Sequence, residues 1–377
     1  MSLQSLDKEK QIVILLSKAK LVQSEVELLI TLLNTHMNWS TVVGLLQTHR
    51  LVGIAWGNVS KYLISEGIDT IVFSKLLNFL RNMHTVQYEK AQTQCRQLLE
   101  ICEEFEKHDI KYCILKGIVL SEYGYNDAGA RDFNDNDILI HPNQIKEAIT
   151  ILEQKGYVQG KISLKEKTVI PVQRKETLFW SMVSHEVHPL ILKLDDNKFL
   201  DFHIVDLQYS IDLNTANRTD LLVDRLLRRR IQIDIKGSSI STLTWEDMLV
   251  FVCHHFYKEA ISYRDVQSYR DLLLYKICDI ANLIVSKKIE IDWDTFIQRA
   301  KELNVTNGVY FALHYTNLVY TDIVPYDVLN TLKPDEINYL HEVYNYDSDT
   351  LAIQWDDNII DRIFDMNRPS RIIKLHS

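Results

Sequence analysis

Two aspartates separated by a single residue begin an apolar run near the middle of the chain. Asp135 and Asp137 are followed by Ile138-Leu139-Ile140. In a β-strand, residues i and i+2 project from the same face, so we expect these two carboxylates to lie side by side. Adjacent carboxylates repel each other unless a cation lies between them, and oxygen-rich acidic sites suit Mg²⁺. The pattern predicts a magnesium site of the kind that serves phosphoryl or nucleotidyl transfer.

The aspartate pair alone is weak evidence, because a chain with 51 acidic residues among 377 contains roughly seven acid-x-acid pairs by chance. A third acid adds support: Asp201 has apolar neighbours in residues 199–203, which we expect to form a separate strand. Three carboxylates on neighbouring strands can hold two Mg²⁺ ions. We therefore predict Asp135, Asp137 and Asp201 as metal ligands and catalytic residues. The competing interpretations are a solvated turn for the pair and a surface charge for Asp201.

Three further residues are candidates for binding phosphate. Gly117 follows a predicted strand and precedes a predicted helix, an arrangement that lets backbone N–H groups approach phosphate. Arg131 lies four residues before Asp135, within reach of a phosphate held by the same metal. Lys116 lies directly before the glycine. The alternatives are a structural salt bridge for Arg131 and simple exposure for Lys116.

Another set of residues indicates a different metal chemistry. Histidines and an aspartate on helices can hold a metal for phosphohydrolysis, and this set comprises His203, His254, His255 and Asp279. Their spacing matches no strong motif, and packing in a helical core is the competing interpretation. The densest basic run lies within residues 225–230. We interpret it as the cationic end of a helix, with a phosphate or acceptor contact as the alternative.

Composition restricts the class of protein. The chain has 377 residues, of which 46% are hydrophobic, and this is sufficient for several domains. Its net charge of −9 disfavours long nucleic acid as a partner. No apolar run approaches the length of a membrane-spanning helix, so no membrane partner is expected. The five cysteines have no metal-ligand spacing. We expect a cytoplasmic protein.

The order of expected elements divides the chain into three parts. Residues 1–108 are expected to be helical, with one or two long helices over 73–107, a stretch without Gly or Pro. Residues 109–215 form an expected α/β block, and residues 216–377 return to helices. The elements expected in the middle block are strands at 111–115, 136–141 and 176–183, a helix at 144–155, and a hairpin of 190–194 with 198–206.

Together these segments resemble a known family. The pattern comprises LKG at 115–117, then Arg131, then DxD at 135–137, then aspartate–apolar–histidine at 201–203. It resembles the DNA polymerase β-type nucleotidyltransferase superfamily and, more narrowly, a bacterial family of uncharacterised nucleotidyltransferases. The similarity extends to helical segments on both sides and covers about residues 40 to 320.

The resemblance implies an α+β fold, with a small mixed sheet as the nucleotidyltransferase core and helical regions on both sides. It implies Mg²⁺-dependent transfer of a nucleoside monophosphate from a nucleoside triphosphate such as ATP to a small-molecule or peptide acceptor, with release of pyrophosphate. Asp135 and Asp137 would bind metal, Asp201 would complete the site and help deprotonate the acceptor, and Arg131 would contact the triphosphate. Two departures, Ile118 after Gly117 and Asn136 between the aspartates, favour the rival hypothesis of a binding module that kept the fold and lost the chemistry.

Overall fold

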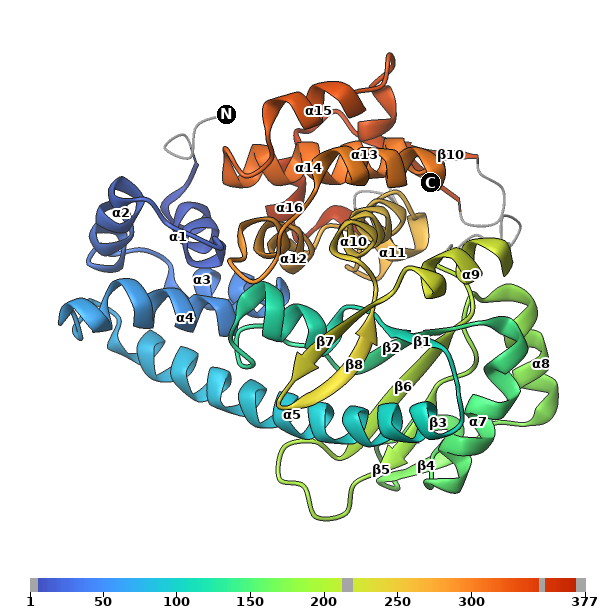
Figure 1. Cartoon of the computed structure of the whole chain (residues 1–377). Coiled ribbons are helices and arrows are strands. Elements are labelled where there is room, and N and C mark those ends of the chain that lie inside the picture. Colours follow the sequence, from blue (N-terminus) through green and yellow to red (C-terminus); the bar gives the residue numbers. More distant parts are fainter. Residues whose placement is uncertain (1–5, 212–219, 346–349, 371–377) are drawn as a thin grey trace. The chain divides into compact units, whose positions relative to one another are not determined.

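The computed structural model describes residues 6–211, 220–345 and 350–370 (Figure 1), without the side chains of 181–183. The chain divides into two compact units. We call residues 86–122 and 133–248 the sheet unit, and residues 1–85, 123–132 and 249–377 the helical unit. The predicted long helix is confirmed as one continuous helix, α5 (Ser74–Lys107). It contributes residues to both units.

The sheet unit is built around eight strands in the order β4-β3-β5-β6-β2-β1-β8-β7. The strands are β1 (Tyr112–Ile114), β2 (Asp135–Ile140), β3 (Val158–Ser163), β4 (Thr168–Pro171), β5 (Leu190–Lys193), β6 (Phe202–Gln208), β7 (Ile231–Ile235) and β8 (Ser238–Thr242). β2 pairs in parallel with β6 and antiparallel with β1, so the sheet is mixed. Its helices are α6 (Gly117–Val119), α7 (Ile145–Gln154), α8 (Arg174–Val183) and α9 (Asp220–Arg228).

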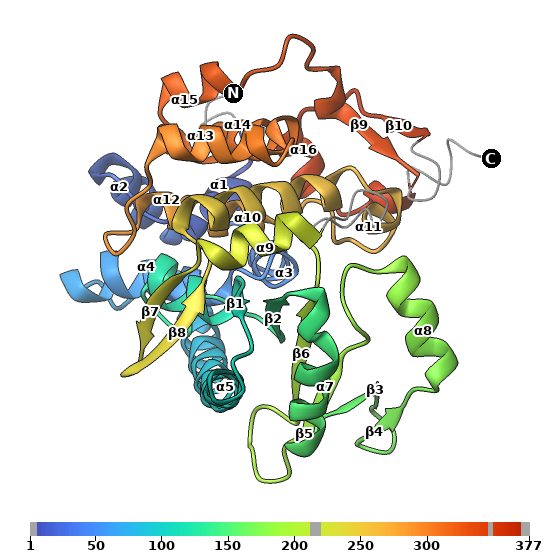
Figure 2. The same ribbon diagram turned by 45° about the vertical axis from the view of Figure 1, so that its right-hand side comes forward.

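Two helices cover the same face of this sheet. An ion pair between Lys155, directly after α7, and Glu104 of α5 joins them at 3.7 Å, and Figure 2 shows α5 end-on with α7 in front of β6. Strand alternation gives the sheet its two faces. In β2, Asn136 and Ile138 belong to the covered face, while Asp135 and Asp137 belong to the other. The apolar run after the aspartates is fully buried, as the sequence predicts.

The helical unit combines both ends of the chain, whose helices are blue and orange in Figure 1. Its helices are α1 (Lys8–Ser17), α2 (Gln23–Leu33), α3 (Trp39–Thr48), α4 (Val52–Tyr62), most of α10 (Trp245–Ala260), α11 (Tyr263–Gln267), α12 (Leu274–Val285), α13 (Trp293–Glu302), α14 (Thr306–Tyr320), α15 (Tyr326–Leu332) and α16 (Ile359–Phe364). A two-stranded sheet, β9 (Glu342–Tyr344) with β10 (Leu351–Gln354), packs through Val343 and Ile353 onto Val266 of α11. Short helices are η2 (Ile64–Glu66), η3 (Leu120–Tyr125), η4 (Pro142–Gln144) and η6 (Asn338–His341).

The two units combine segments from all three predicted parts of the chain, whose boundaries were expected at residues 108 and 215. The N-terminal and C-terminal helices form one unit: the buried Ser17 hydroxyl of α1 lies 2.8 Å from the Tyr320 hydroxyl of α14, and Cys278 of α12 contacts the same hydroxyl at 3.0 Å. Residues 231–242, expected among the helices, instead form the β7–β8 hairpin at the end of the sheet. Contacts between distant segments, rather than chain order, therefore define the units.

The prediction of a strand at 176–183 is wrong, because these residues lie in helix α8. Leu178 and Phe179 are adjacent, yet 56% and 64% of their surfaces are exposed. A strand here would have needed a partner beyond β4, the last strand of the sheet. Arg174, Lys175 and Leu178 all have a high helix propensity. Because no neighbouring strand among the described residues is available to pair with this segment, the helix propensity of its residues determines its structure.

The α+β class predicted from the sequence is confirmed. The expected hairpin of β5 with β6 is also present, with Lys193 opposite Phe202, although its connection at 194–201 is longer than a short turn. All five cysteines are free and buried. No helix within the described residues is long and apolar enough to cross a membrane.

Candidate metal centre

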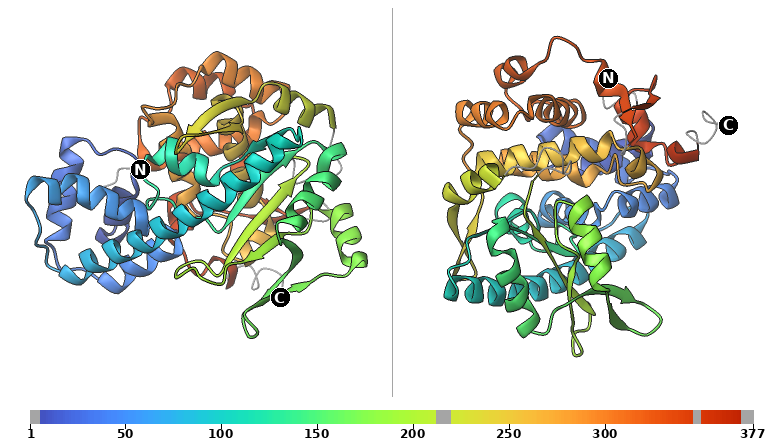
Figure 3. Two further views of the ribbon diagram at one scale, coloured as in Figure 1. Left: turned by 60° about the horizontal axis from the view of Figure 1, so that its bottom comes forward. Right: turned by 90° about the vertical axis from the view of Figure 1, so that its right-hand side faces the viewer.

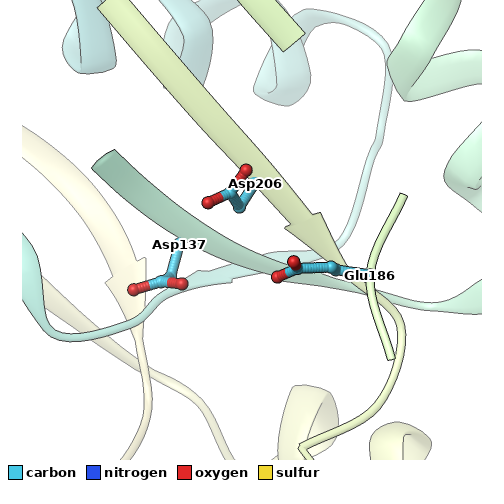
Figure 4. Close-up of side chains that lie close together, drawn as sticks. All are labelled: Asp137, Glu186 and Asp206. Atoms are coloured by element: carbon cyan, nitrogen blue, oxygen red, sulfur yellow. The ribbon is translucent and has the colours of Figure 1, made fainter. Parts of the chain in front are cut away.

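Three carboxylates from three parts of the sheet unit converge on one face of the sheet. Asp137, Glu186 and Asp206 each place an oxygen within 4.8 Å of the other two (Figure 4). Within the residues that the structure describes, this is the one group of three or more acids, histidines or cysteines close enough to share a metal ion. Of the three carboxylates predicted from the sequence, the group contains Asp137, and its other two members are Glu186 and Asp206.

The pairing of two parallel strands positions the first two carboxylates. Asp137 of β2 lies directly beside Asp206 of β6, and Asn136 lies beside Val205. Residues paired across neighbouring strands share a face of the sheet, so both aspartates project from the face that α5 and α7 leave uncovered. Apolar neighbours on β6, Val205 and Leu207, are buried and fix the direction in which Asp206 points.

The third carboxylate is held by an additional bridge to β6. Glu186 lies before β5 and forms an isolated antiparallel bridge with Gln208. Backbone hydrogen bonds on both sides secure it: Val187 N donates to Leu207 O at 3.0 Å, and Tyr209 N donates to His185 O at 3.1 Å. This bridge places Glu186 beside the end of β6, two residues beyond Asp206.

Burial, with added repulsion between the carboxylates, raises the pKa of two members of the cluster. Burial, followed by the Asp137 charge, raises the pKa of Glu186 to about 7, and Lys116 partly opposes this shift. Burial is also the largest cause that raises the pKa of Asp206 well above its usual range, and the charges of Glu186 and Asp137 add to it. Like charges in a low-dielectric site disfavour ionisation of both groups. A bound cation would reverse this effect, because it favours the ionised carboxylates.

Two neighbours orient Asp137. Gln208, on the same face of β6 as Asp206, donates from Nε2 to Asp137 Oδ1 at 2.6 Å. Lys116 Nζ lies 3.6 Å from Asp137 Oδ2. Leu115 N donates to Asp137 O at 2.9 Å, which aligns the end of β1 with β2 and brings Lys116 to the cluster. Lys116 adopts φ 39° and Gly117 φ 40°, a region that favours glycine, so the chain turns sharply here.

The donor set fits a hard divalent cation. All three side chains offer carboxylate oxygens, which Mg²⁺ prefers, and no sulfur or imidazole ligand belongs to the group. Asp206 Oδ1 is buried and, among the described residues, has no hydrogen-bond partner. A buried unpaired carboxylate oxygen is costly, and a cation at this position would satisfy it.

Asp135 is exposed at the start of β2, on the same face as Asp137, and does not belong to the group of three. Its negative charge contributes to the raised pKa values of Glu186 and Asp206. Its role as a metal ligand stays a prediction.

The structure does not bring Asp201 into the group of three carboxylates. Asp201 is exposed and precedes β6, whose first residue, Phe202, pairs with Lys193. The residue beside Asp137 is instead Asp206, five positions further along the strand, or roughly 16 Å at the rise of an extended chain. The sequence contained a usable signal, because Asp206 also has two apolar neighbours. Glu186 had no such signal, since its position depends on the bridge to β6.

The structure pairs Arg131, the predicted triphosphate contact, with a buried aspartate. Arg131 belongs to the helical unit, whereas the carboxylates belong to the sheet unit. Its guanidinium is buried and donates to both carboxylate oxygens of Asp279, at 2.9 and 2.8 Å. Tyr125 donates to the same carboxylate at 2.8 Å. The structural salt bridge, the alternative interpretation, is what the structure shows.

Asn136, between the two aspartates, faces the covered side of the sheet. Its Nδ2 donates to Gln94 Oε1 of α5 at 2.7 Å and lies 2.9 Å from His203 Nε2. His203 Nδ1 lies 2.7 Å from the Tyr157 hydroxyl. Burial lowers the pKa of His203 to about 3, so this ring is neutral. We call Gln94, Asn136, His203 and Tyr157 the amide–imidazole network.

The residues proposed for a second metal chemistry divide between the two units and have other contacts within them. His203 is part of the amide–imidazole network in the sheet unit, whereas His254, His255 and Asp279 belong to the helical unit. There, Asp279 pairs with Arg131 and His255 Nδ1 lies 3.2 Å from Glu259.

The basic run at 225–230 is engaged in structural contacts at the end of α9. Arg228 pairs with Asp224 at 2.6 Å, and Arg229 Nη2 donates to Asp247 Oδ1 at 2.7 Å. Arg230 donates to Leu227 O at 2.7 Å. The cationic helix end is therefore the better interpretation of this run.

A mixed sheet with clustered carboxylates on one face is the arrangement expected of a nucleotidyltransferase core. The model of a family described as uncharacterised nucleotidyltransferase matches residues 35–321. The chain belongs to this family, and the resemblance inferred from the LKG and DxD segments is confirmed.

A crystal structure of an antigenic nucleotidyltransferase-like protein from Paracoccidioides brasiliensis is similar to 60% of this chain and 91% of its own, with 15% identity and a TM-score of 0.29. Comparison with curated proteins gave no match.

Proposed function

We propose that this chain is a Mg²⁺-dependent nucleotidyltransferase that transfers a nucleoside monophosphate from a nucleoside triphosphate to a small-molecule or peptide acceptor, releasing pyrophosphate. The observation that carries the proposal is the convergence of Asp137, Glu186 and Asp206 within 4.8 Å on one face of the sheet. Membership of the nucleotidyltransferase family supports it.

The carboxylates of the cluster and their neighbours have different roles in this proposal. Asp137, Glu186 and Asp206 would hold the metal, and Asp135 is a further candidate at the exposed edge of the same face. Bound Mg²⁺ would neutralise charge on the triphosphate and on the departing pyrophosphate. Gln208 fixes the orientation of Asp137 through its hydrogen bond. Lys116 places a positive charge at the cluster, where it can attract phosphate oxygens.

Burial contributes to the reaction by limiting water at the cluster. The side chains of Asp137 and Lys116 are only 13% and 16% exposed, so electrostatic interactions at this site are stronger than at an open surface. Catalysis would then come mainly from positioning and from charge stabilisation. The net charge of −9 is consistent with a small or peptide acceptor rather than long nucleic acid.

The decisive experiment compares two aspartates of the same region. Asp206→Asn should abolish Mg²⁺-dependent pyrophosphate release from ATP or another nucleoside triphosphate, because it removes a carboxylate of the cluster. Asp201→Asn is the matched control and should keep the wild-type rate, because Asp201 is exposed and outside the cluster. Circular dichroism verifies that both variants fold.

Thermal unfolding separates the enzyme from the rival binding module. The enzyme should be stabilised by nucleoside triphosphate only when Mg²⁺ is present, and Asp206→Asn should lose that stabilisation. Equal pyrophosphate release by Asp206→Asn and the wild type would refute the proposal. The structure weakens one argument for the rival, because Asn136 points away from the carboxylates and is hydrogen-bonded.

A further inference from the structure

Helix α8 presents an exposed stripe of two cations and two apolar side chains. Arg174 and Leu178 are four residues apart, as are Lys175 and Phe179, so all four lie on one side of the helix. All four are exposed, Leu178 to 56% and Phe179 to 64%. We call these four residues the α8 stripe.

The composition of the α8 stripe does not serve the stability of the fold. Arg174 and Lys175 occupy the first turn of α8, where the helix dipole disfavours positive charge. Across the described part of the chain, neither cation has an acidic partner within ion-pair distance. Exposed, adjacent leucine and phenylalanine side chains add apolar surface in contact with water, which is a feature of interaction sites.

The opposite side of α8 is anchored to the sheet unit. The Trp180 ring packs on His188 with centroids 5.3 Å apart. Tyr209 donates from its hydroxyl to Ser184 O, directly after the helix, at 2.8 Å. These contacts hold the α8 stripe outward, and the chain then continues from Ser184 to Glu186 of the metal centre. The surface and the carboxylate cluster are thus joined by a short, fixed segment.

The β3–β4 hairpin is basic and exposes apolar side chains, like the α8 stripe. It projects from the edge of the sheet (Figure 3), and an ion pair between Lys161 and Glu176 links it to α8. Residues 161–176 contain five lysines or arginines and two glutamates, in a chain whose net charge is −9. Leu164 and Ile170 of the hairpin are 84% and 49% exposed. The region is therefore both basic and apolar.

We propose that the α8 stripe binds an acidic peptide segment that carries apolar side chains, and that this segment belongs to the acceptor. The assignment of the acceptor rests on the proposed function; the binding of the peptide does not. An acidic apolar peptide satisfies both features at once: its carboxylates pair with Arg174 and Lys175, and its apolar side chains cover Leu178 and Phe179. An RNA would pair with the cations but would leave the leucine without a matching partner.

The test measures binding of a labelled synthetic peptide that alternates glutamate with leucine and phenylalanine. Fluorescence anisotropy with the full chain, without nucleotide, should show saturable binding by the wild type. Arg174→Glu/Lys175→Glu and Leu178→Ser/Phe179→Ser should each weaken binding at least about tenfold, because each removes one of the two complementary features. All substitutions are on exposed positions, so folding should be retained.

Matched controls exist in the same unit. Lys146→Glu changes an exposed cation in the first turn of α7, a helix of 10 residues like α8, and Leu221→Ser changes a leucine that is 70% exposed. Both should bind the peptide like the wild type. The proposal is overturned if the wild type does not bind the peptide, if the α8 and control variants bind equally, or if single-stranded RNA displaces the peptide and binds more tightly.

The outcome is independent of the metal centre. Asp206→Asn should bind the peptide with wild-type affinity, because Asp206 is not part of the α8 stripe. Conversely, the α8 variants should retain Mg²⁺-dependent stabilisation by nucleoside triphosphate. If the wild type binds nucleoside triphosphate with Mg²⁺ but does not bind the peptide, the docking surface alone is rejected. If the wild type binds the peptide but shows no Mg²⁺-dependent turnover of nucleoside triphosphate, the proposed function alone is rejected.

Discussion

At the scale of single residues, the segment Asp135-Asn136-Asp137 has two different environments. The strand turns its aspartates toward the face with the carboxylate cluster and its asparagine toward α5, where Asn136 is 1% exposed. A buried polar side chain lowers the stability of the fold unless its polar groups are hydrogen-bonded. The contacts with Gln94 and His203 pair the Nδ2 of Asn136, whereas its buried Oδ1 has no hydrogen-bond partner among the described residues. The asparagine is a structural part of the core and lies on the face opposite the carboxylates.

Replacing Asn136 with leucine should destabilise the fold. The change restores an apolar residue but leaves the buried polar groups of Gln94 and His203 without Asn136 as a partner. Each group left unpaired costs roughly 1–3 kcal/mol, which urea unfolding would detect. Asn134→Leu, at an exposed position two residues earlier, should change stability little. An Asn136→Leu variant as stable as the wild type would show that the amide–imidazole network is not needed.

At the scale of elements, the β3–β4 hairpin depends on one close approach. A Cβ added at Gly160 would lie 2.6 Å from Ile170 O and 2.6 Å from Val169 Cγ1. The first contact is with backbone, which cannot rotate away, so the two strands must separate.

Gly160→Ala should therefore destabilise the hairpin. We expect a lower melting temperature, faster proteolysis within residues 161–170, and weaker binding of the acidic apolar peptide, because Lys161 no longer holds Glu176 of α8. Gly67→Ala has no heavy atom within 4 Å of the added Cβ, although its φ of +80° carries a strain of its own. It should leave hairpin proteolysis unaltered. Equal cleavage of the Gly160→Ala and wild-type hairpins would contradict the argument.

The elements also show what the sequence predicts and what it does not. The absence of Gly and Pro predicted α5, and the apolar run after the aspartates predicted β2. The β7–β8 hairpin was missed although Ile231, Ile233 and Ile235 alternate with polar residues before a Lys-Gly turn. The local sequence pattern was sufficient to predict an element whose structure depends mainly on its own residues.

Prediction of the site residues failed where their positions depend on contacts between several elements. Asp201 and Asp206 have similar neighbours, and only the register of β6 against β2 selects Asp206. Glu186 enters the site through a single bridge to Gln208 outside any strand. Arg131 was assigned to phosphate because it is near Asp135 in the chain, but its buried partner Asp279 is distant in sequence. Sequence separation is thus a poor guide to which charges meet.

At the scale of the whole molecule, neutral buried histidines occur in both units. Burial is the largest cause that lowers the pKa of His49 and His203 to about 3 and that of His254 to about 4, from an ordinary value of 6.5. His203 lies in the sheet unit and the other two lie in the helical unit. Between the folded and unfolded pKa values, the unfolded chain binds more protons than the folded chain.

Acid should therefore destabilise the protein well before its ordinary carboxylates titrate. The stabilising contribution of each histidine is complete above pH 6.5 and is lost as pH falls toward the folded pKa, which amounts to roughly 2 kcal/mol per histidine at about pH 5. Urea unfolding at several pH values between these limits measures the slope. His203→Gln should reduce that slope, whereas His36→Gln, which changes an exposed histidine, should leave it unaltered. A His203→Gln variant with the wild-type slope would mean that this ring is protonated in the folded protein, and the amide–imidazole network would then need a different arrangement of its hydrogen bonds.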